Sequence, residues 1–351
     1  PWFRGSKLNY PWTKYTPNPK GFPFSGVKGL PNENDWGVIP VADKELDDVK
    51  TVDFALRFLK SKQDSPFFLA CGLFRPHLPW YAPRRFFDLY PLDKVVVPKK
   101  FEEDLDDVPE IGKSFATARR SDLNKIEKQG SIIRAVQAYL ASISYADEQL
   151  GRILDVLESS EYNSNTVIIF WSDHGWHLGE KRHWHKSTLW EESTRIPLII
   201  AVPQLKPDVC NQPVSLLDLY PTLMELCAIK GGHEFDGLSL MPQLRLAETK
   251  RNPAVIEFRK GNAAVRSERW RYIRYSDGSE ELYDHKTDSF EWKNLASKKK
   301  YKSVKQNLSE WLPKQWAESA LSKNAFKFDP DSYSWVNKKT GKRYFGSKSD
   351  N

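Results

Sequence analysis

Short apolar runs alternate with amphipathic helical segments through most of this chain. Apolar side chains recur at helical spacing from Ala42 to Lys62, and the run Pro66–Gly72 that follows has the length and composition of a buried strand. The same order returns later, where a helical pattern over 133–157 precedes apolar runs at 167–171 and 198–202. Such alternation is typical of a parallel sheet covered by helices. The sequence therefore predicts an α/β fold with a mostly parallel sheet flanked by helices.

The pattern changes to antiparallel strands after residue 230. Residues 269–275 and 280–283 are rich in strand-forming side chains and are joined through Asp277–Gly278, which is a strong hairpin signal. We therefore expect two domains. A catalytic α/β domain would span residues 1–230, and a smaller C-terminal α+β subdomain, an antiparallel sheet packed with helix, would span residues 231–351.

Two segments show no sustained period of apolar residues. Elsewhere, one acidic residue interrupts the apolar face of a predicted helix. Residues 1–40 are rich in Pro, Gly and aromatic side chains, whereas residues 91–130 are polar and Lys-rich, so we expect both to be irregular excursions from the scaffold. In the helix over 133–157, Asp147 falls on the predicted core face. It would be either a buried structural anchor or a site residue, and we favour the anchor.

Composition limits the classes of partner. With 351 residues and 40% hydrophobic content the chain can bury a large core. A net charge of +7 and 13 Trp suit an acidic, ring-bearing partner such as a sulfated sugar. The basic residues are scattered and form no nucleic-acid-binding signature, so we expect no nucleic acid partner. Apolar runs of roughly eight residues predict no membrane span, and three cysteines without C-x-x-C predict no disulfide framework or zinc ribbon. The oligomeric state stays open.

Polar residues follow two of the predicted strands. Ser172-Asp173-His174-Gly175 comes directly after the run 167–171, and His77 lies in a loop stiffened by two prolines after the run Pro66–Gly72. In open α/β sheets, ligands gather at the carboxyl ends of strands. Asp173 suits a hard cation such as Ca²⁺ or Mg²⁺, and a rigidly presented histidine can protonate a leaving oxygen. Taken singly, each cluster is more often a local hydrogen-bonding turn.

The residues that follow Ser172–Gly175 give a more specific signal. The stretch Asp173–Glu180 leads to Lys186, which is followed by Glu191, Arg195 and Pro197 at five, nine and eleven residues. This string closely resembles the sulfatase family, whose pattern has lysine, glutamate, arginine and proline at these spacings. The chain is most similar to the iduronate-2-sulfatase group. Further resemblance runs through residues 139–158, 213–222 and 261–296.

The resemblance implies both a fold and an activity. It implies an alkaline-phosphatase/sulfatase-like fold and hydrolysis of sulfate esters, expected to be those of a sulfated sugar or glycosaminoglycan, by a formylglycine and Ca²⁺ mechanism. By resemblance, Asp173 and His174 bind the metal, expected to be one Ca²⁺ ion rather than Mg²⁺. Lys186 and His77 are catalytic. Substrate contacts are expected from His77, Lys186, His177 and Trp184.

The nucleophile that the resemblance calls for is not found in these residues. In sulfatases a C-x-P-S-R or similar motif supplies the formylglycine, and none of Cys71, Cys210 and Cys227 has that context. We therefore expect the earlier part of the catalytic domain, with this motif, to be missing from the 351 residues. Alternatives are a phosphatase or phosphonate hydrolase of the same superfamily and a non-catalytic sulfated-glycan-binding fragment. By resemblance we expect a periplasmic, secreted or lysosomal protein, although no signal segment is readable.

The residues around Lys186 have interpretations of their own. Glu191 and Arg195 are expected to orient the Lys186 loop or to pair with each other at i, i+4. Several histidines and tryptophans crowd the same region, and we expect substrate contact or surface exposure for the histidines rather than a zinc cluster. The tryptophans would form either a sugar-stacking wall or the packing of the loop. These residues are His177, His183 and His185, and Trp80, Trp176 and Trp184.

Overall fold

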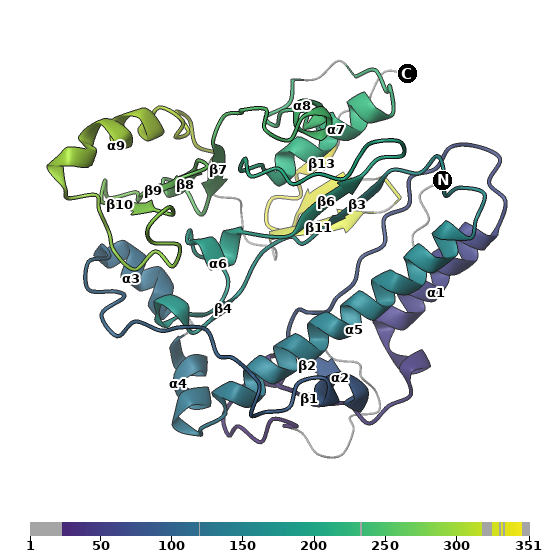
Figure 1. The fold of residues 1–351 in the computed structure, drawn as a ribbon, viewed down its shortest axis with the longest axis horizontal. Helices are drawn as coiled ribbons and strands as arrows, with labels where there is room; N and C mark the ends of the chain where they lie inside the picture. The colour runs from purple at the N-terminus through teal and green to yellow at the C-terminus, as the bar shows by residue number, and fades with distance from the viewer. Residues whose placement is uncertain are drawn as a thin grey trace.

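The computed structural model describes residues 23–118, 120–231, 234–317, 325–329, 331–332 and 334–345. Residues 1–22, within the expected N-terminal excursion, lie outside this range. Figure 1 shows a long helix pair on one side of the molecule and an antiparallel sheet on the other. The site residues predicted from the sequence lie on the segments between these two parts.

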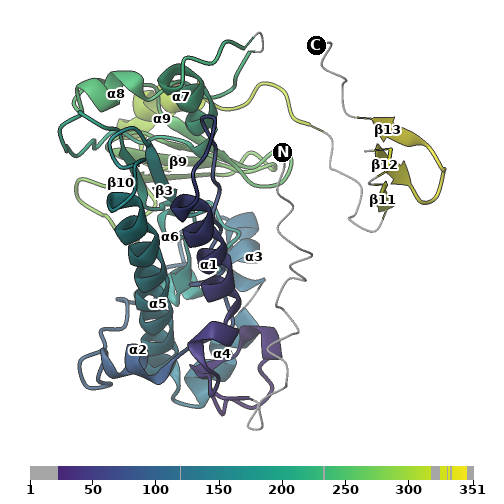
Figure 2. The same ribbon diagram turned by 90° about the vertical axis from the view of Figure 1, so that its right-hand side faces the viewer.

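Two helices predicted from the sequence form the first part. α5 spans Ile132–Glu158, and α1 spans Asp47–Lys60 and packs along it, as both views show (Figures 1 and 2). The short helix α2, Arg84–Asp88, packs against the same helix. The buried side of α5 is made mostly of small residues, which let neighbouring backbones approach closely. Its fully buried side chains include Ala135, Ala138, Ala141 and Ser142.

The predicted role of Asp147 is wrong, since its side chain is exposed. The buried stripe of α5 runs through its alanines and Tyr145, whereas Ile143 and Leu154 are 39% and 37% exposed. The core face predicted from the sequence was defined by large aliphatic residues. The face that is buried in the structure, where α5 packs against α1, instead contains the alanines. Asp147 therefore requires no buried partner.

A pair of short strands closes the end of this helical layer. β1, Trp36–Val38, pairs in parallel with β2, Trp80–Ala82. The 3₁₀ turns Asn32–Asn34 and Asp43–Glu45 flank β1. Asp35, fully buried beside β1, accepts hydrogen bonds from the backbone N–H groups of Phe24 and Ser25 and from the Tyr81 hydroxyl. The described part of the predicted excursion is thus held at Phe24 and Ser25 by a specific polar contact.

The expected mostly parallel sheet is not what the described strands form. β3, Ile168–Trp171, pairs antiparallel with β6, Leu198–Ala201, and among the described residues only β1–β2 is a parallel pair. The run 66–72 is not a strand, and Phe68 within it is 77% exposed. A strand needs a hydrogen-bonded neighbour, and no described segment pairs with this run. The connection 172–197 returns the chain beside β3 in the opposite direction, which gives an antiparallel pair.

The C-terminal sheet is as predicted. Its strands follow the antiparallel order β10-β9-β8-β7. The predicted hairpin turns at Gly278, whose φ of 85° suits glycine. The helix α9, Lys302–Ser309, covers one face through Leu308. The strand bounds are β7 Ala254–Glu257, β8 Ala263–Arg266, β9 Trp270–Arg274 and β10 Glu280–Asp284.

The opposite face of this sheet shares a core with earlier parts of the chain. Ile273 and Tyr283 pack with Phe115 and Trp190. Phe115 belongs to α3, Glu110–Thr117, which is followed by α4, Arg120–Lys128, so the segment 91–130 is partly helical rather than an irregular insertion. This core contains residues from both sides of position 230. The domain boundary expected there therefore remains a prediction.

The remaining elements are short. α7, Leu219–Leu226, follows a 3₁₀ turn at Leu216–Asp218, and α8 spans Met241–Arg245. A 3₁₀ turn at Lys299–Tyr301 leads into α9. Figure 2 shows the last sheet, β11–β13, lying apart from the rest. Its strands are Phe326–Asp329, Ser334–Asn337 and Arg343–Phe345.

Among the helices that the structure describes, none combines the length and apolar character needed to cross a bilayer. The expected compartment and the oligomeric state stay predictions.

Candidate active site

Three of the predicted site residues meet at one point. The Lys186 ammonium lies 2.9 Å from Nε2 of His77 and 2.6 Å from Nε2 of His174. His174 directly follows Asp173 after β3, His77 comes from the loop before β2, and Lys186 follows β5, Trp184–His185. Residues 109 positions apart are therefore in direct contact. The predicted grouping of these side chains is what the structure shows, although their chemical roles remain proposals.

The backbone fixes the tautomer of both histidines. Nδ1 of His77 lies 2.7 Å from the Leu78 carbonyl oxygen, and Nδ1 of His174 lies 2.9 Å from that of Gly175. A carbonyl only accepts, so each Nδ1 carries the hydrogen and each Nε2 presents a lone pair to the lysine. The ammonium is thus bound by two neutral acceptors rather than by a carboxylate.

Burial sets the protonation of this group. The pKa of His77 is lowered to about 4, chiefly by removal from water and also by the neighbouring Lys186 and His174, while the Leu78 carbonyl and Asp173 oppose the change. Burial also lowers the pKa of Lys186, with Asp173 opposing the change. His77 is therefore neutral near pH 7, and Lys186 is the group that carries the proton in the ligand-free site.

The Lys186 loop has a strained backbone. His185 and Ser187, on either side of Lys186, have φ values of 98° and 74°, which residues with a Cβ rarely adopt. Lys181 and Arg182, in the 3₁₀ turn Glu180–Arg182 of the same loop, are also left-handed. Such conformations persist only where the surroundings enforce them.

Residues of the 91–130 segment help to enforce this conformation. His185 Nε2 lies 3.0 Å from the Asp122 carboxylate, and the buried Lys181 ammonium lies 2.7 Å from that of Asp104. His183 contacts the carbonyl oxygens of Ala116 and Lys186. Sequence reasoning missed Asp104 and Asp122, since a lone aspartate in a polar segment gives no signal of its partner. The segment that was not interpretable in sequence therefore supports the Lys186 loop.

The burial of His177 and Trp184 argues against their predicted substrate contacts. Both side chains have no exposed surface, so neither can touch a substrate in this structure. His177 lies in β4, His177–Leu178, which pairs with β5, and its Nε2 contacts the Thr188 hydroxyl at 2.9 Å. His183 and His185 are also buried, so the expected exposure of these histidines is wrong. Their polar atoms serve the loop itself.

Of the three tryptophans proposed as a sugar-stacking wall, Trp80 and Trp184 are core residues without exposure. Trp176 is only partly buried, and its ring lies 5.8 Å from that of His77 and 6.3 Å from that of His174. It packs on Trp80 from the other side, at 5.8 Å. Trp176 therefore supports the two histidines from the core, in line with the loop-packing alternative.

The predicted metal ligands fit a cation to different degrees. Asp173 has an 82% exposed side chain with its Oδ1 3.6 Å from His174 Nε2, so its carboxylate is open to a hard cation. His174 fits less well, because Nε2 already accepts from Lys186 and an ion there would displace the ammonium. Ca²⁺ takes about six to eight oxygen ligands, so these two residues offer only part of a coordination shell.

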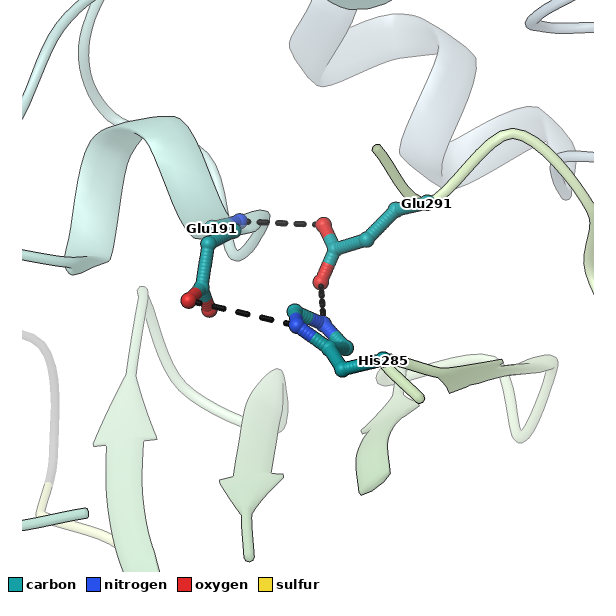
Figure 3. Close-up of side chains that lie close together, drawn as sticks. All are labelled: Glu191, His285 and Glu291. Carbon is teal, nitrogen blue, oxygen red and sulfur yellow. Dashed lines mark hydrogen bonds and ion pairs between the residues drawn. The ribbon is translucent and has the colours of Figure 1, made fainter. Parts of the chain in front are cut away.

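A second group of potential ligand atoms lies away from Lys186. Glu191, His285 and Glu291 bring one ligand atom each within 4.8 Å of one another (Figure 3). The two carboxylates, however, are already paired with Arg266 and Arg271, and His285 Nδ1 accepts from Arg266 at 2.9 Å. A cation would have to displace two guanidinium groups.

The sequence-based pairing of Glu191 with Arg195 is wrong, because α6 ends at Thr194 and Arg195 is extended and exposed.

Gly175 offers a test of how closely α6, Glu191–Thr194, packs on the Asp173–His174 turn. Its N–H donates to the Ser193 carbonyl at 2.9 Å, and a Cβ at this position would lie 1.9 Å from the Glu192 carbonyl oxygen. Gly175→Ala should therefore lower the free energy of unfolding by about 1–3 kcal/mol, as overpacking does. Urea unfolding measures this. The control is Gly151→Ala in α5, where a Cβ meets nothing within 4 Å and alanine should stabilise; equal effects of the two variants would contradict the packing argument.

Comparisons with known proteins agree with this geometry. Residues 2–229 match the sulfatase family, and residues 179–318 match the C-terminal part of N-sulphoglucosamine sulphohydrolase. A sulfatase of Formosa agariphila is 39% identical over 288 residues, covering 80% of this chain and 56% of the relative. Human iduronate 2-sulfatase is 35% identical over 178 residues, which are 47% of this chain and 32% of the relative. The chain thus spans about half the length of the curated relatives it matches.

Solved structures show the same fold. A phosphonate monoester hydrolase from Silicibacter pomeroyi has a TM-score of 0.70 at 21% identity and covers 83% of this chain and 64% of its own. A protein solved with its substrate D-glucosamine-2-N,6-O-disulfate has a TM-score of 0.60 at 19% identity, covering 75% and 68%. The family match extends over more than half of the residues and includes the motif from Asp173 to Pro197. The chain belongs to the sulfatase family.

Proposed function

We propose that this protein hydrolyses sulfate esters and that its substrate is a sulfated sugar. The observation that carries the proposal is the Lys186 ammonium bound between Nε2 of His77 and Nε2 of His174. The two hydrogen-bond partners of this ammonium carry no charge, so neither of them neutralises it, which suits an anion. The family match, the iduronate 2-sulfatase relative and the fold neighbour solved with a disulfated glucosamine support the substrate class.

The chemistry assigned to these residues follows from their protonation. Lys186 would donate hydrogen bonds to the sulfate and to the oxygen that leaves, where negative charge develops as the S–O bond breaks. His77 would contact the same sulfate through Nε2 and share in moving a proton to the leaving oxygen, a role in which it receives its proton from Lys186. The Leu78 carbonyl holds the His77 ring in the orientation that this requires.

Asp173 is the residue proposed to hold the cation, expected to be Ca²⁺, with His174 beside it. A bound divalent cation would neutralise charge on a sulfate oxygen. The Asp173 carboxylate lies one residue before His174, so an ion bound to it would lie next to Lys186. His174 could join the ligands once an anion draws the ammonium away from Nε2.

The nucleophile is proposed to come from a segment outside these 351 residues. The matched relatives extend well beyond the region they share with this chain. Large apolar side chains on the β3–β6 sheet support a further layer of protein, since Trp171 is 44% exposed and Ile199 is 60% exposed. The 351-residue chain alone would accordingly bind sulfate without turning over an ester.

Sulfate binding by the 351-residue chain tests the site without requiring turnover. In an NMR titration with sodium sulfate, the ring nitrogen signals of His77 and His174 should shift together and saturate. Sodium chloride at equal ionic strength is the control, because screening alone also moves signals. Shifts that follow ionic strength rather than sulfate, or that spare both histidines, would contradict an anion site at Lys186.

A phosphonate or phosphate ester hydrolase is the second candidate, favoured by the TM-score of 0.70 to a phosphonate monoester hydrolase. A phosphate monoester carries more negative charge than a sulfate ester, so it needs more positive charge in the site. A longer form that contains the family nucleophile motif would distinguish them by its kcat/KM for a sulfate ester compared with the matching phosphate and phosphonate monoesters. The sulfatase proposal requires the larger value for the sulfate ester.

A further inference from the structure

The buried network on α6 joins the C-terminal sheet to the Lys186 loop. The Glu191 carboxylate lies 3.1 Å from Nε of Arg266, at the end of β8. It also forms an ion pair with Arg271 of β9. Arg271 is 1% exposed, and its Nε lies 2.5 Å from the buried carboxylate of Glu291. Figure 3 shows Glu191, Glu291 and His285 facing one another, with each residue joined to the other two by a hydrogen bond or ion pair. His285 Nε2 contacts Glu291 Oε1 at 2.8 Å, which completes the network.

The charges of this network balance internally. Two carboxylates face two guanidinium groups, and His285 accepts at Nδ1 from Arg266 and donates at Nε2 to Glu291, as its neutral form does. Burial alone would raise the pKa of Glu191, but Arg271 and Arg266 outweigh it and lower the pKa to about 2. The network is therefore a set of satisfied ion pairs.

Two members, Arg271 and Glu291, also contact the chain on either side of Lys186. Arg271 Nη1 donates to the Leu189 carbonyl at 2.8 Å, three residues after Lys186. Glu291 Oε2 accepts from the backbone N–H of Glu191 at 3.0 Å and so holds the start of α6. The Lys181 ammonium, on the other side of Lys186, donates to the Glu291 carbonyl oxygen. The loop is thus held at both ends by the same buried group.

The other side of α6 determines the position of His174. The Ser193 carbonyl accepts from Gly175, and the Glu192 carbonyl lies so close that only glycine fits there. Any shift of α6 therefore moves the turn that carries His174, while a shift of Leu189 moves Lys186. The distance of 2.6 Å between His174 and Lys186 depends on both.

We infer that Glu191, held by Arg266 and Arg271 of the C-terminal sheet, is a positioning residue that sets the geometry between Lys186 and His174. The inference rests on the proposed function, in that the site it positions is the proposed sulfate site. Glu191 itself does not contact the Lys186 ammonium, so its effect passes through α6 and the loop. The C-terminal sheet is on this account part of the machinery that shapes the site, rather than a separate structural unit.

Glu191→Gln tests this, because it keeps the shape of the side chain and removes the charge that two arginines bind. We expect the His77 and His174 ring nitrogen signals to shift without any ligand, and the sulfate affinity of the 351-residue chain to fall about tenfold, as for partners that orient a binding group. Arg269→Gln is the matched control, since it breaks the pair between the half-exposed Arg269 and Asp284 beside the same sheet without touching Glu191. Unchanged signals and affinity in folded Glu191→Gln would overturn the inference, as would an equal loss in Arg269→Gln.

A second variant covers a failure of Glu191→Gln to fold. Arg266→Lys keeps one positive charge near Glu191 but loses the contact with His285, and we expect smaller shifts of the same two histidine signals. Absence of those shifts in folded Arg266→Lys would also overturn the inference. The proposed function fails separately, if the wild-type chain does not bind sulfate. The ligand-free signals still report on positioning in that case.

Discussion

Lys186→Ala should abolish saturable sulfate binding by the 351-residue chain and lower the turnover of a longer, nucleophile-containing form by roughly 10²–10³-fold. The ammonium lies within hydrogen-bonding distance of two neutral imidazoles, at 2.9 Å and 2.6 Å. It is the positive group at the point where the three predicted residues meet. Without it, two neutral rings remain, and they offer an anion no full charge.

The measurement has two parts. The NMR titration with sulfate gives the binding, and kcat and KM of the longer form give the turnover. Lys94→Ala is the control, because that lysine is 78% exposed and lies outside the site. Lys186→Arg adds a test of shape, since a guanidinium keeps the charge but cannot place a compact ammonium between two Nε2 atoms. If Lys186→Ala retains wild-type affinity and turnover, the proposed role of Lys186 is wrong.

Arg271→Met should lower the free energy of unfolding by about 3–5 kcal/mol, because it leaves two buried carboxylates without their shared partner. Arg271 is 1% exposed and binds both Glu191 and Glu291, and its guanidinium also donates to the Leu189 carbonyl. Urea unfolding at pH 7 measures the loss. Arg269→Gln, which breaks the pair of a half-exposed arginine beside the same sheet, should cost much less than Arg271→Met.

The pH dependence gives this prediction a sign. The pKa of Glu191 is about 2 in the folded protein, below its ordinary value of 4.5, so the ionised carboxylate stabilises the fold above pH 4.5. That contribution is lost as the pH falls from 4.5 toward 2. Arg271→Met removes the largest attractive partner, so the variant should lose less stability over that acid window than the wild type. A wild-type slope in the variant would contradict the account of Glu191.

Local patterns were sufficient for the long helices and the C-terminal hairpin. The helix predicted over 133–157 is α5, and the hairpin through Asp277–Gly278 is β9–β10. These elements depend on side-chain period and on one left-handed glycine, both of which are legible in a single segment. Asp147 was assigned to the wrong face of α5, because which face of a helix is buried depends on the elements that pack against it, and these are distant in sequence.

The strand pattern was less informative. Residues 167–171 and 198–202 were recognised as strands, but their direction was not, and the run 66–72 forms no strand among the described residues. A short apolar run indicates compatibility with a sheet, whereas pairing and direction depend on segments distant in sequence. His177 and Trp184 show the same limit, since burial cannot be read from a motif.

The sequence by itself determined the family, because the spacing from Asp173 through Lys186 to Pro197 is a local property of the chain, and it predicted Asp173, His174, Lys186 and His77 as site residues. Only the tertiary structure decided how they are held. Asp104 and Asp122 support the Lys186 loop from a segment without a legible pattern, and Arg271 reaches Glu191 from 80 residues away. Such ion pairs form between side chains that only folding brings together, and burial makes each depend on its exact partner.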